Sequence, residues 1–384
     1  MYDFDKKIPR KNTNSLKWDS IDSKLPMWVA DMDFPVFDGI NKGILDRMKC
    51  PIYGYSITPD EYFLAYISWW KRRHHIEFDR DWMLFSTGVV PTISSTVRKL
   101  TTPAEKVILL TPCFNMFYNS ILNNGRVVLS SDLIYENHEY RIDFSDLENK
   151  MKDPQATLMI LCNPHNPVGR IWTKEELERI GQLSVKYNVV VLSDEIHCDI
   201  VEEGYEYIPY CSVSDECKMN SITAISATKC FGVPGLQSSA VVVPNPFLRH
   251  KVWRGLNTDE CAEGNVFAYT PIINALNDGE TWVNEMNAYV KENKRLFTEG
   301  LKDTGLIFIE AHALYVLWVD VSNYTLDAKE FVDHLYKTTG LYITEGIEYG
   351  EAGKSFVRIN LATTKDNIKE AISLMKEAIN SFKK

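Results

Sequence analysis

A single lysine, Lys229, stands in a segment of small residues, SATKCFGVPGLQSS (226–239), directly after a run that predicts a strand. Ser226 lies three residues before it. A lysine that is partly removed from water has a lowered pKa, and its amine can attack a carbonyl group to form a Schiff base. The ordinary alternative is a solvated loop lysine, so other groups in the chain have to decide its role.

A second candidate is the segment STGVVP (86–91), where Gly88 precedes a predicted helix with Pro91 in its first turn. The backbone N–H groups of Gly88, Val89 and Val90 would be free there, and such groups bind phosphate. A plain connection between a loop and a helix is the alternative. The chain contains neither a G-x-G-x-x-G motif nor a P-loop, so a nicotinamide-dependent dehydrogenase and an ATP-binding protein lose their main support.

Two polar side chains follow strongly apolar runs. Asn166 lies in CNPHNPVG (162–169), where two Asn-Pro steps force an extended turn. Its amide is then available either to a ligand oxygen or to its own backbone. Asp194 closes the run NVVVLSDE (188–195), where an unpaired carboxylate would be costly, so it needs a cationic or proton-donating partner.

Metal binding is one way to use Asp194, because Glu195, His197 and Asp199 lie close to it in the sequence. A second histidine at ligand spacing is missing, however, and His165 belongs to a separate loop. We therefore expect no metal and favour an organic cofactor that carries a protonatable nitrogen.

One ligand would satisfy all of these groups. Ligands of open α/β sheets bind beyond the carboxyl ends of the strands, which is where these residues fall. Pyridoxal phosphate could place its phosphate on the N–H groups of 88–90 and on Ser226. Its phenolic oxygen would meet Asn166 and its ring nitrogen Asp194, and its aldehyde would react with Lys229.

The elements that must position these residues form two groups. Short runs that are apolar on both faces predict buried strands of a largely parallel sheet; they lie at 105–112, 157–164, 188–195, 221–229 and 238–244. Between two of them, 173–188 predicts a helix with a capping box at its start. The last hundred residues predict helices at 281–303 and 365–384 with strands at 313–321 and 355–362. We therefore expect a large α/β domain over 46–281 and a smaller α+β domain built from 1–45 and 282–384.

Composition excludes several classes of protein. The 384 residues carry a formal net charge of −10, which argues against a nucleic-acid groove. We expect no membrane span and no signal peptide, because no apolar stretch has the required length. The eight cysteines are scattered without a C-x-x-C pair, which favours reduced thiols and a cytoplasmic location.

With these residues in view, the chain resembles the fold-type I pyridoxal-phosphate enzymes of the aminotransferase class I/II superfamily. Within that group it is most similar to the cystathionine β-lyase (C–S lyase) branch of the MalY/PatB type. The motifs that carry the resemblance are PMWVADMDFP (26–35), YGYS (53–56), TGVVP (87–91), CNPHNPVGR (162–170), SDEIHCDIV (193–201), the Lys229 segment and SFVRIN (355–360). The resemblance implies a type I transferase fold, in which a large domain has a mixed, mostly parallel sheet between helices.

The resemblance also implies roles for individual residues. Lys229 would form the Schiff base with the cofactor, and Asp194 would pair with the pyridinium nitrogen. Phe114 would stack on the cofactor ring, and His197 would contribute to the same site. Tyr55 would reach the cofactor phosphate of a neighbouring subunit, which implies a homodimer with shared active sites.

For the substrate, the resemblance implies that Arg358 clamps the α-carboxylate, with Asn166 and Ala30 beside it. The alternation of 355–360 supports this role, because it separates Arg358 from the apolar face of its strand. The chain departs from the family around the lysine, in Cys230-Phe231-Gly232, and in LATT (361–364) after the arginine strand. These departures bear on substrate preference.

The expected reaction is β-elimination from a sulfur-containing amino acid such as cystathionine. Lys229 would remove the α-proton, and a thiol, pyruvate and ammonia would be released. An aminotransferase shares every step up to proton removal and is the alternative; no second arginine for a dicarboxylic substrate is evident. A regulatory protein without turnover is a more distant alternative, since Lys229 and Asp194 are both present.

Overall fold

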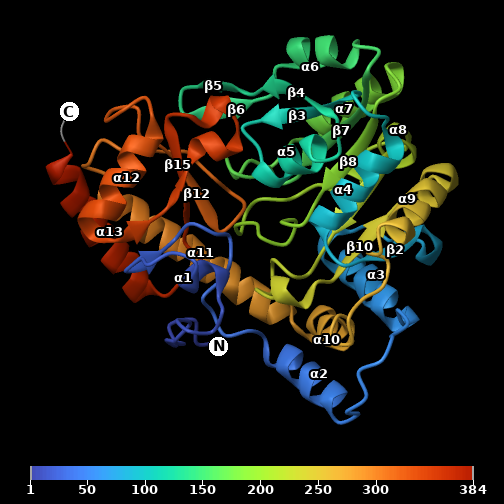
Figure 1. Ribbon diagram of the computed structural model, residues 1–384, viewed down its shortest axis with the longest axis horizontal. Coiled ribbons are helices and arrows are strands. Elements are labelled where there is room, and N and C mark those ends of the chain that lie inside the picture. Colours follow the sequence, from blue (N-terminus) through green and yellow to red (C-terminus); the bar gives the residue numbers. More distant parts are fainter. Residues whose placement is uncertain (1, 383–384) are drawn as a thin grey trace.

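A seven-stranded sheet forms the centre of the larger part of the molecule (Figure 1). The computed structural model describes residues 2–382. The strand order is β2-β10-β9-β8-β7-β3-β4, with β10 antiparallel to both of its neighbours and the other pairs parallel. The strands are β2 (Met83–Ser86), β3 (Lys106–Thr111), β4 (Val127–Asp132), β7 (Ala156–Cys162), β8 (Val190–Asp194), β9 (Ser221–Ile225) and β10 (Ser239–Val242). The predicted mixed, mostly parallel sheet is confirmed.

Helices cover both faces of this sheet, because successive strand residues belong to different cores. Ile108 and Leu110 of β3 pack with the helices α6 (Phe144–Met151) and α7 (Lys174–Lys186). Val107 and Leu109 of the same strand pack on the other side with three helices, α4 (Val89–Leu100), α5 (Asn115–Leu122) and α9 (Pro246–Thr258). This is the alternation expected of a strand buried on both faces.

The predicted capping box is present at the start of α7. The Thr173 side chain accepts from the backbone N–H of Glu176, and the Glu176 carboxylate accepts from the backbone N–H of Thr173. The remaining elements of the larger part are α3 (Asp60–His74), α8 (Asp215–Met219), α10 (Thr270–Asp278), the hairpin of β5 (Ile134–Glu136) and β6 (Glu139–Arg141), and the short 3₁₀ helices η1 (Arg80–Trp82), η2 (Tyr210–Ser212) and η3 (Pro234–Leu236).

A smaller antiparallel sheet, in the order β11-β12-β15-β14, carries the C-terminal part of the chain. Its strands are β11 (Ile307–Phe308), β12 (Val316–Asp320), β14 (Thr344–Glu345) and β15 (Phe356–Asn360), and its helices are α11 (Glu280–Leu301), α12 (Ala328–Thr339) and α13 (Lys365–Ser381), with η4 (Gly346–Tyr349) and η5 (Glu351–Gly353). The helices and strands expected here are confirmed, although the last two residues of the predicted closing helix, 383–384, lie outside the described residues.

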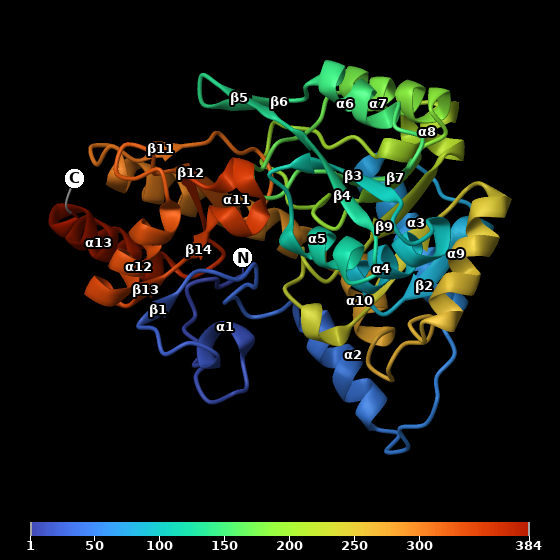
Figure 2. The ribbon, with the colours of Figure 1, turned by 45° about the horizontal axis from the view of Figure 1, so that its top comes forward.

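The N-terminal segment lies beside this smaller sheet, as Figure 2 shows for α1 (Leu16–Asp19) and β1 (Leu25–Pro26). The strand β1 pairs in parallel with β13 (Leu341–Tyr342). The next helix, α2 (Asp38–Met48), instead packs on α10, where a Cβ at Gly43 would lie 2.8 Å from Cα of Pro271. The expected boundary at 45/46 therefore runs through a helix, and the domain limits stay a prediction.

Length and apolar character together would be needed for a helix to cross a membrane. None of the helices within residues 2–382 combines the two.

Candidate active site

The carboxyl ends of β7, β8 and β9 bring the predicted residues together. In the sheet register Asp194 is the partner of Cys162 on one side and of Ala224 on the other. The segments that follow these strands carry Asn166, His197 and Lys229, and parallel neighbours direct such segments to one edge.

Asp194 is a buried carboxyl at this edge, with 3% of its surface exposed. Its Oδ1 accepts a hydrogen bond from the backbone N–H of Ile196 at 3.1 Å. Burial raises the pKa of Asp194 to about 7, with the neighbouring charge of Glu195 adding to the effect, while the Ile196 bond and the charge of Lys229 oppose it. A protonated ring nitrogen is a partner that such a carboxyl would favour.

Glu195 is also buried but is fully engaged by the protein. It accepts hydrogen bonds from the hydroxyl of Ser193 at 2.7 Å, from the backbone N–H of Tyr210 at 3.0 Å and from the hydroxyl of Tyr207. Both carboxylate oxygens are therefore occupied by donors of the protein, and Glu195 fixes the loop after β8.

Lys229 is partly buried, and its Nζ donates to the backbone carbonyl of Ala30 at 2.7 Å. The hydroxyl of Tyr315 donates to the same oxygen at 3.0 Å. Burial lowers the pKa of Lys229 to about 8; the charge of Arg358 acts in the same direction, and those of Asp31 and Asp194 oppose it. The structure thus places Ala30 directly against the predicted Schiff-base lysine.

Arg358 on β15 reaches across to Asn166, both being buried. Its Nη1 donates to Oδ1 of Asn166 at 3.3 Å, and its Nη2 donates to the carbonyl of Trp28 at 3.1 Å. Its guanidinium also lies 4.8 Å from the centre of the Tyr349 ring. The Nε atom of Arg358 is buried and has no hydrogen-bond partner among the described residues, so it is available to a carboxylate.

The backbone N–H groups that are predicted to bind the phosphate lie at the start of α4. Gly88 is the N-cap residue, and its carbonyl accepts from the backbone N–H of Thr92 at 3.1 Å and from its hydroxyl at 2.9 Å. The N–H groups of the first helical turn, Val89 and Val90, have no partner within the helix by its geometry. Nothing in these contacts competes with an anion there.

Ser226 is buried, and its hydroxyl donates to the backbone carbonyl of Ser238 at 2.7 Å. The same hydroxyl lies 2.8 Å from the hydroxyl of Thr228. A phosphate oxygen would therefore have to draw the Ser226 proton away from Ser238. Its phosphate role stays a prediction, and Thr228 is a neighbouring hydroxyl that the sequence did not single out.

Phe114, His197 and Tyr55 have different environments. Phe114 is the N-cap of α5, is partly buried, and has its ring 5.6 Å from that of Phe117 in an edge contact. His197 is buried and its Nδ1 has no hydrogen-bond partner among the described residues, while burial holds its pKa well below the usual value. Tyr55 is fully exposed, so a single chain does not bring it into the site.

The residues fit pyridoxal phosphate on these observations. The site contains a buried carboxyl that prefers a cationic partner and an amine of lowered pKa. It also contains two buried nitrogen atoms, one on His197 and one on Arg358, that have no hydrogen-bond partner within residues 2–382. Sequence reasoning missed Tyr315, Tyr349 and the carbonyl of Trp28. Both tyrosines are buried aromatic residues and had no signal to separate them from the core.

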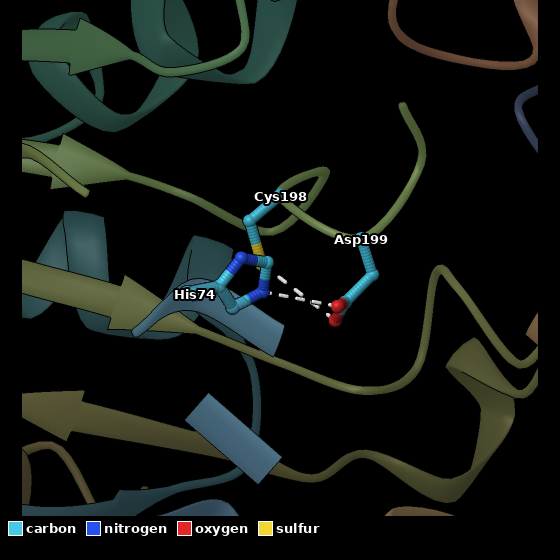
Figure 3. A group of neighbouring side chains, drawn as sticks. All are labelled: His74, Cys198 and Asp199. Carbon is cyan, nitrogen blue, oxygen red and sulfur yellow. Dashed lines mark hydrogen bonds and ion pairs between the residues drawn. The ribbon is translucent and has the colours of Figure 1, made fainter. Parts of the chain in front are cut away.

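A separate group of possible metal ligands lies at His74, Cys198 and Asp199, as Figure 3 shows. Asp199 accepts from Nε of Arg73 at 3.0 Å and from Nε1 of Trp69 at 3.0 Å, and it lies 3.0 Å from Nε2 of His74. Burial raises the pKa of the Cys198 thiol well above its usual value. These contacts describe a paired carboxylate that fixes α3, and we assign no metal to it.

Known proteins share the sequence pattern and the fold of this chain. The sequence pattern of Aminotransferase class I and II matches residues 29–374. The chain belongs to this family. Cystathionine beta-lyase PatB of Bacillus subtilis (strain 168) is 35% identical, over 98% of this chain and 100% of its own length. Protein MalY of Escherichia coli (strain K12) is 27% identical over 100% of both chains.

A solved structure agrees with this family. The crystal structure of cystalysin from Treponema denticola contains a pyridoxal 5'-phosphate cofactor. It matches this chain with a TM-score of 0.96 and 28% sequence identity, and the match covers 100% of each chain. The resemblance drawn from the motifs and the type I fold are confirmed.

Proposed function

We propose that the protein is a pyridoxal-phosphate-dependent carbon–sulfur β-lyase that cleaves L-cystathionine or related cysteine S-conjugates. The observation that carries the proposal is the meeting of Lys229 and Asp194 at one edge of the large sheet with Arg358, which reaches Asn166 at that edge from the small sheet, while the lysine amine lies against Ala30. The identity of 35% to a cystathionine β-lyase along nearly the whole chain supports the choice of reaction.

Cofactor binding would divide among the residues of the large sheet. When bound, pyridoxal phosphate supplies an electron sink for the α-carbon of an amino acid. Asp194 would hold the ring nitrogen protonated, and Asn166 would donate to the ring oxygen. The N–H groups at 88–90 and Ser226 would bind the phosphate, with Phe114 against the ring.

Lys229 would carry the proton. Because its pKa is lowered to about 8, an appreciable fraction of the amine is neutral near neutral pH and can accept the α-proton of the substrate. The electron pair left at the α-carbon then forms a double bond to the β-carbon as the carbon–sulfur bond breaks and the thiolate departs. Water completes the reaction to pyruvate and ammonia, and the thiol from cystathionine is homocysteine.

Arg358 would hold the α-carboxylate of the substrate. Two of its nitrogen atoms already contact Asn166 and Trp28, and the buried Nε has no hydrogen-bond partner in the part of the chain that the structure describes. A carboxylate that satisfies Nε would gain a charge-assisted bond in a water-poor site, which also fixes the α-proton relative to Lys229.

The decisive experiment measures pyruvate release from L-cystathionine by protein loaded with pyridoxal phosphate and given no oxo acid. Sustained release over many turnovers, lost in Lys229→Ala, supports the lyase. Without pyruvate from either cystathionine or L-cysteine, an aminotransferase would take its place, because the same residues serve proton removal in both reactions.

The active unit is proposed to be a homodimer. Ile52, Tyr53, Tyr55 and Ile57 are exposed apolar side chains in one segment without helix or strand, with Tyr55 fully exposed. A second copy of the chain would cover such a segment and allow Tyr55 to reach the partner's phosphate site.

A cytoplasmic location is proposed as well. All eight cysteines are free thiols, seven of them buried, which suits a reducing compartment. Cell fractionation with an antibody against the chain tests this, and recovery outside the cytoplasm would overturn it.

A further inference from the structure

The segment 28–31 contacts every cationic group of the site. The carbonyl of Trp28 accepts from Arg358, and the carbonyl of Ala30 accepts from Lys229. The neighbouring carbonyls of Val29 and Asp31 both accept from the side-chain amide of Asn360, at 2.8 and 2.7 Å. This backbone is therefore part of the active-site wall.

Charged side chains hold the end of this segment. Nζ of Lys17, which is fully buried, donates to the carbonyl of Asp31 at 3.0 Å and to the carboxylate of Asp33 at 2.6 Å. Arg10 binds the Asp31 carboxylate at 2.6 Å and that of Asp33 at 2.9 Å. The proposed reaction requires none of these charges. Among them, Asp31 lies one residue after Ala30, whose carbonyl accepts from Lys229.

We propose that Asp31 is a positioning residue of the active site: its carboxylate, held by Arg10, stabilises the charged form of the Lys229 amine and so limits when that amine acts as a base. The base role of Lys229 rests on the proposed function, but the electrostatic coupling does not.

Geometry and electrostatics agree on this assignment. Asp31 directly follows Ala30, whose carbonyl accepts from Nζ of Lys229 at 2.7 Å. Asn360 and Lys17 hold the backbone carbonyl of Asp31 and Arg10 holds its carboxylate, so its charge has a fixed place beside the residue that the amine contacts. The charge of Asp31 is the leading influence that raises the Lys229 pKa against burial. The pair of Arg10 and Asp31 is only 23% and 21% exposed, so solvent and salt screen it less than a surface pair.

Other charged and titratable groups face Lys229 from the elements around it. They are Asp194 at the end of β8, His197 after it, Arg358 on β15, and Tyr315 before β12. Each of them already has a place in the proposed site. Asp31 differs because its carboxylate forms an ion pair with Arg10, a residue outside the site.

The sign of each change follows from the charges. Asp31→Asn removes a negative charge near the amine, so the ammonium form is less favoured and the pKa of Lys229 falls, by about one pH unit. Arg10→Gln frees the Asp31 carboxylate from its ion pair, so the Lys229 pKa rises. In Asp31→Asn the positive charge of Arg10 is left without its partner. The double variant removes that charge as well, so its Lys229 pKa should lie between the values of the two single variants.

The test measures the titration of Lys229 in the full chain without cofactor. Acetic anhydride labels neutral amines, and mass spectrometry of the Lys229 peptide at a series of pH values gives the labelling curve. The control is Asp153→Asn. Asp153 and Lys106 form a pair that is 26% and 27% exposed, similar to the pair of Asp31 and Arg10. Lys106 begins β3, whereas the site lies at the carboxyl ends of the strands. Its Lys229 curve should match that of the unchanged protein.

Asp31→Glu keeps the charge and should restore the original curve. In the loaded enzyme, the acidic limb of the pH profile for pyruvate release should move to lower pH in Asp31→Asn and to higher pH in Arg10→Gln. An unchanged Lys229 curve in folded Asp31→Asn would overturn the proposal. If that variant does not fold, Arg10→Gln carries the test, and an unchanged curve there has the same meaning. Because labelling needs neither substrate nor cofactor, this outcome is separate from failure of the lyase assay.

Discussion

Arg358 and Asn166 are 192 positions apart in the chain, and Nη1 of the arginine donates to Oδ1 of the asparagine at 3.3 Å. Arg358 belongs to the small antiparallel sheet, whereas Asn166 follows a strand of the large one. The contact therefore joins the predicted carboxylate clamp to the predicted cofactor edge. Substrate held by Arg358 would lie where the chemistry of Lys229 can reach it.

Substitution of this arginine should affect substrate binding most. Arg358→Lys keeps the charge but loses the planar fork, so it should raise KM for the amino acid and lower kcat/KM by roughly ten- to a hundredfold, as expected for loss of a charge-assisted hydrogen bond. Steady-state kinetics with L-cystathionine measure this. Arg295→Lys, on the exposed face of α11, is the control. An unchanged KM in Arg358→Lys would remove the carboxylate role.

The Lys229 amine should titrate at an unusually low pH in the chain without cofactor. Lys229 must be neutral to accept a proton, and its pKa is lowered to about 8 by burial in the chain without cofactor. The labelling curve of Lys229 should therefore have its midpoint near pH 8, well below the usual lysine value of about 10.4. A midpoint at the usual lysine value of about 10.4 would contradict the buried environment.

Asp194 should destabilise the chain that lacks cofactor. Its folded pKa is raised to about 7, so the folded state binds the proton between about pH 4 and 7 where the unfolded chain has released it. Stability contributed by the protonated carboxyl is present at low pH and is lost as the pH rises through 7. Asp194→Asn should therefore raise the melting temperature at pH 8 and change it little at pH 4.

The same substitution should weaken cofactor binding, because an amide cannot hold the ring nitrogen as a cation. Thermal melts at both pH values, with and without pyridoxal phosphate, measure the two effects together. A melting temperature at pH 8 that falls in the chain without cofactor would contradict the raised pKa.

The buried ion network at the N-terminus should be important for stability. Lys17 is fully buried and pairs with Asp33 at 2.6 Å. Lys17→Met leaves that carboxylate with Arg10 and Trp18 only, so the free energy of unfolding should fall by about 3 kcal/mol, the lower end for breaking a buried pair. Urea unfolding measures this. Lys7→Met is the control, because its pair with Asp366 is exposed, and a matching result for the two variants would show that burial adds nothing.

Much of the fold was predictable because its signals are local. Short apolar runs rich in branched residues favour buried strands, and the Thr173 capping box marks the start of a helix. The site was predictable wherever chemistry needs a particular side chain at a strand end, as with Asp194 and Lys229. Ala30 was predicted from the resemblance alone, and only as a substrate-binding residue. The contact of its carbonyl with Lys229 was not predicted, because residue types do not show which backbone carbonyl accepts a hydrogen bond.

Long-range packing explains the rest. Residues 1–45 were predicted from the sequence to be part of the small domain. The helix α2 packs on α10 through the close approach of Gly43 to Pro271, and no local sequence pattern predicts that contact. Tyr315 likewise reads as an ordinary core aromatic residue, and only the folded chain shows its hydroxyl beside the lysine.

Shared active sites give the last prediction. If Tyr55 binds the phosphate of a partner, Tyr55→Phe should lower the affinity for pyridoxal phosphate about tenfold, because one hydrogen bond to a charged group is lost. The protein should remain a dimer. Light scattering and cofactor titration measure both. Tyr205→Phe is the control, because its side chain is also exposed, at 48%, and lies outside the exposed segment of 52–57. Mixing Tyr55→Phe with Lys229→Ala chains should also produce hybrid dimers with one site that has both native residues and tight cofactor binding. A monomeric mass for the unchanged protein, or equal cofactor affinity in Tyr55→Phe, would show that each chain builds its site alone.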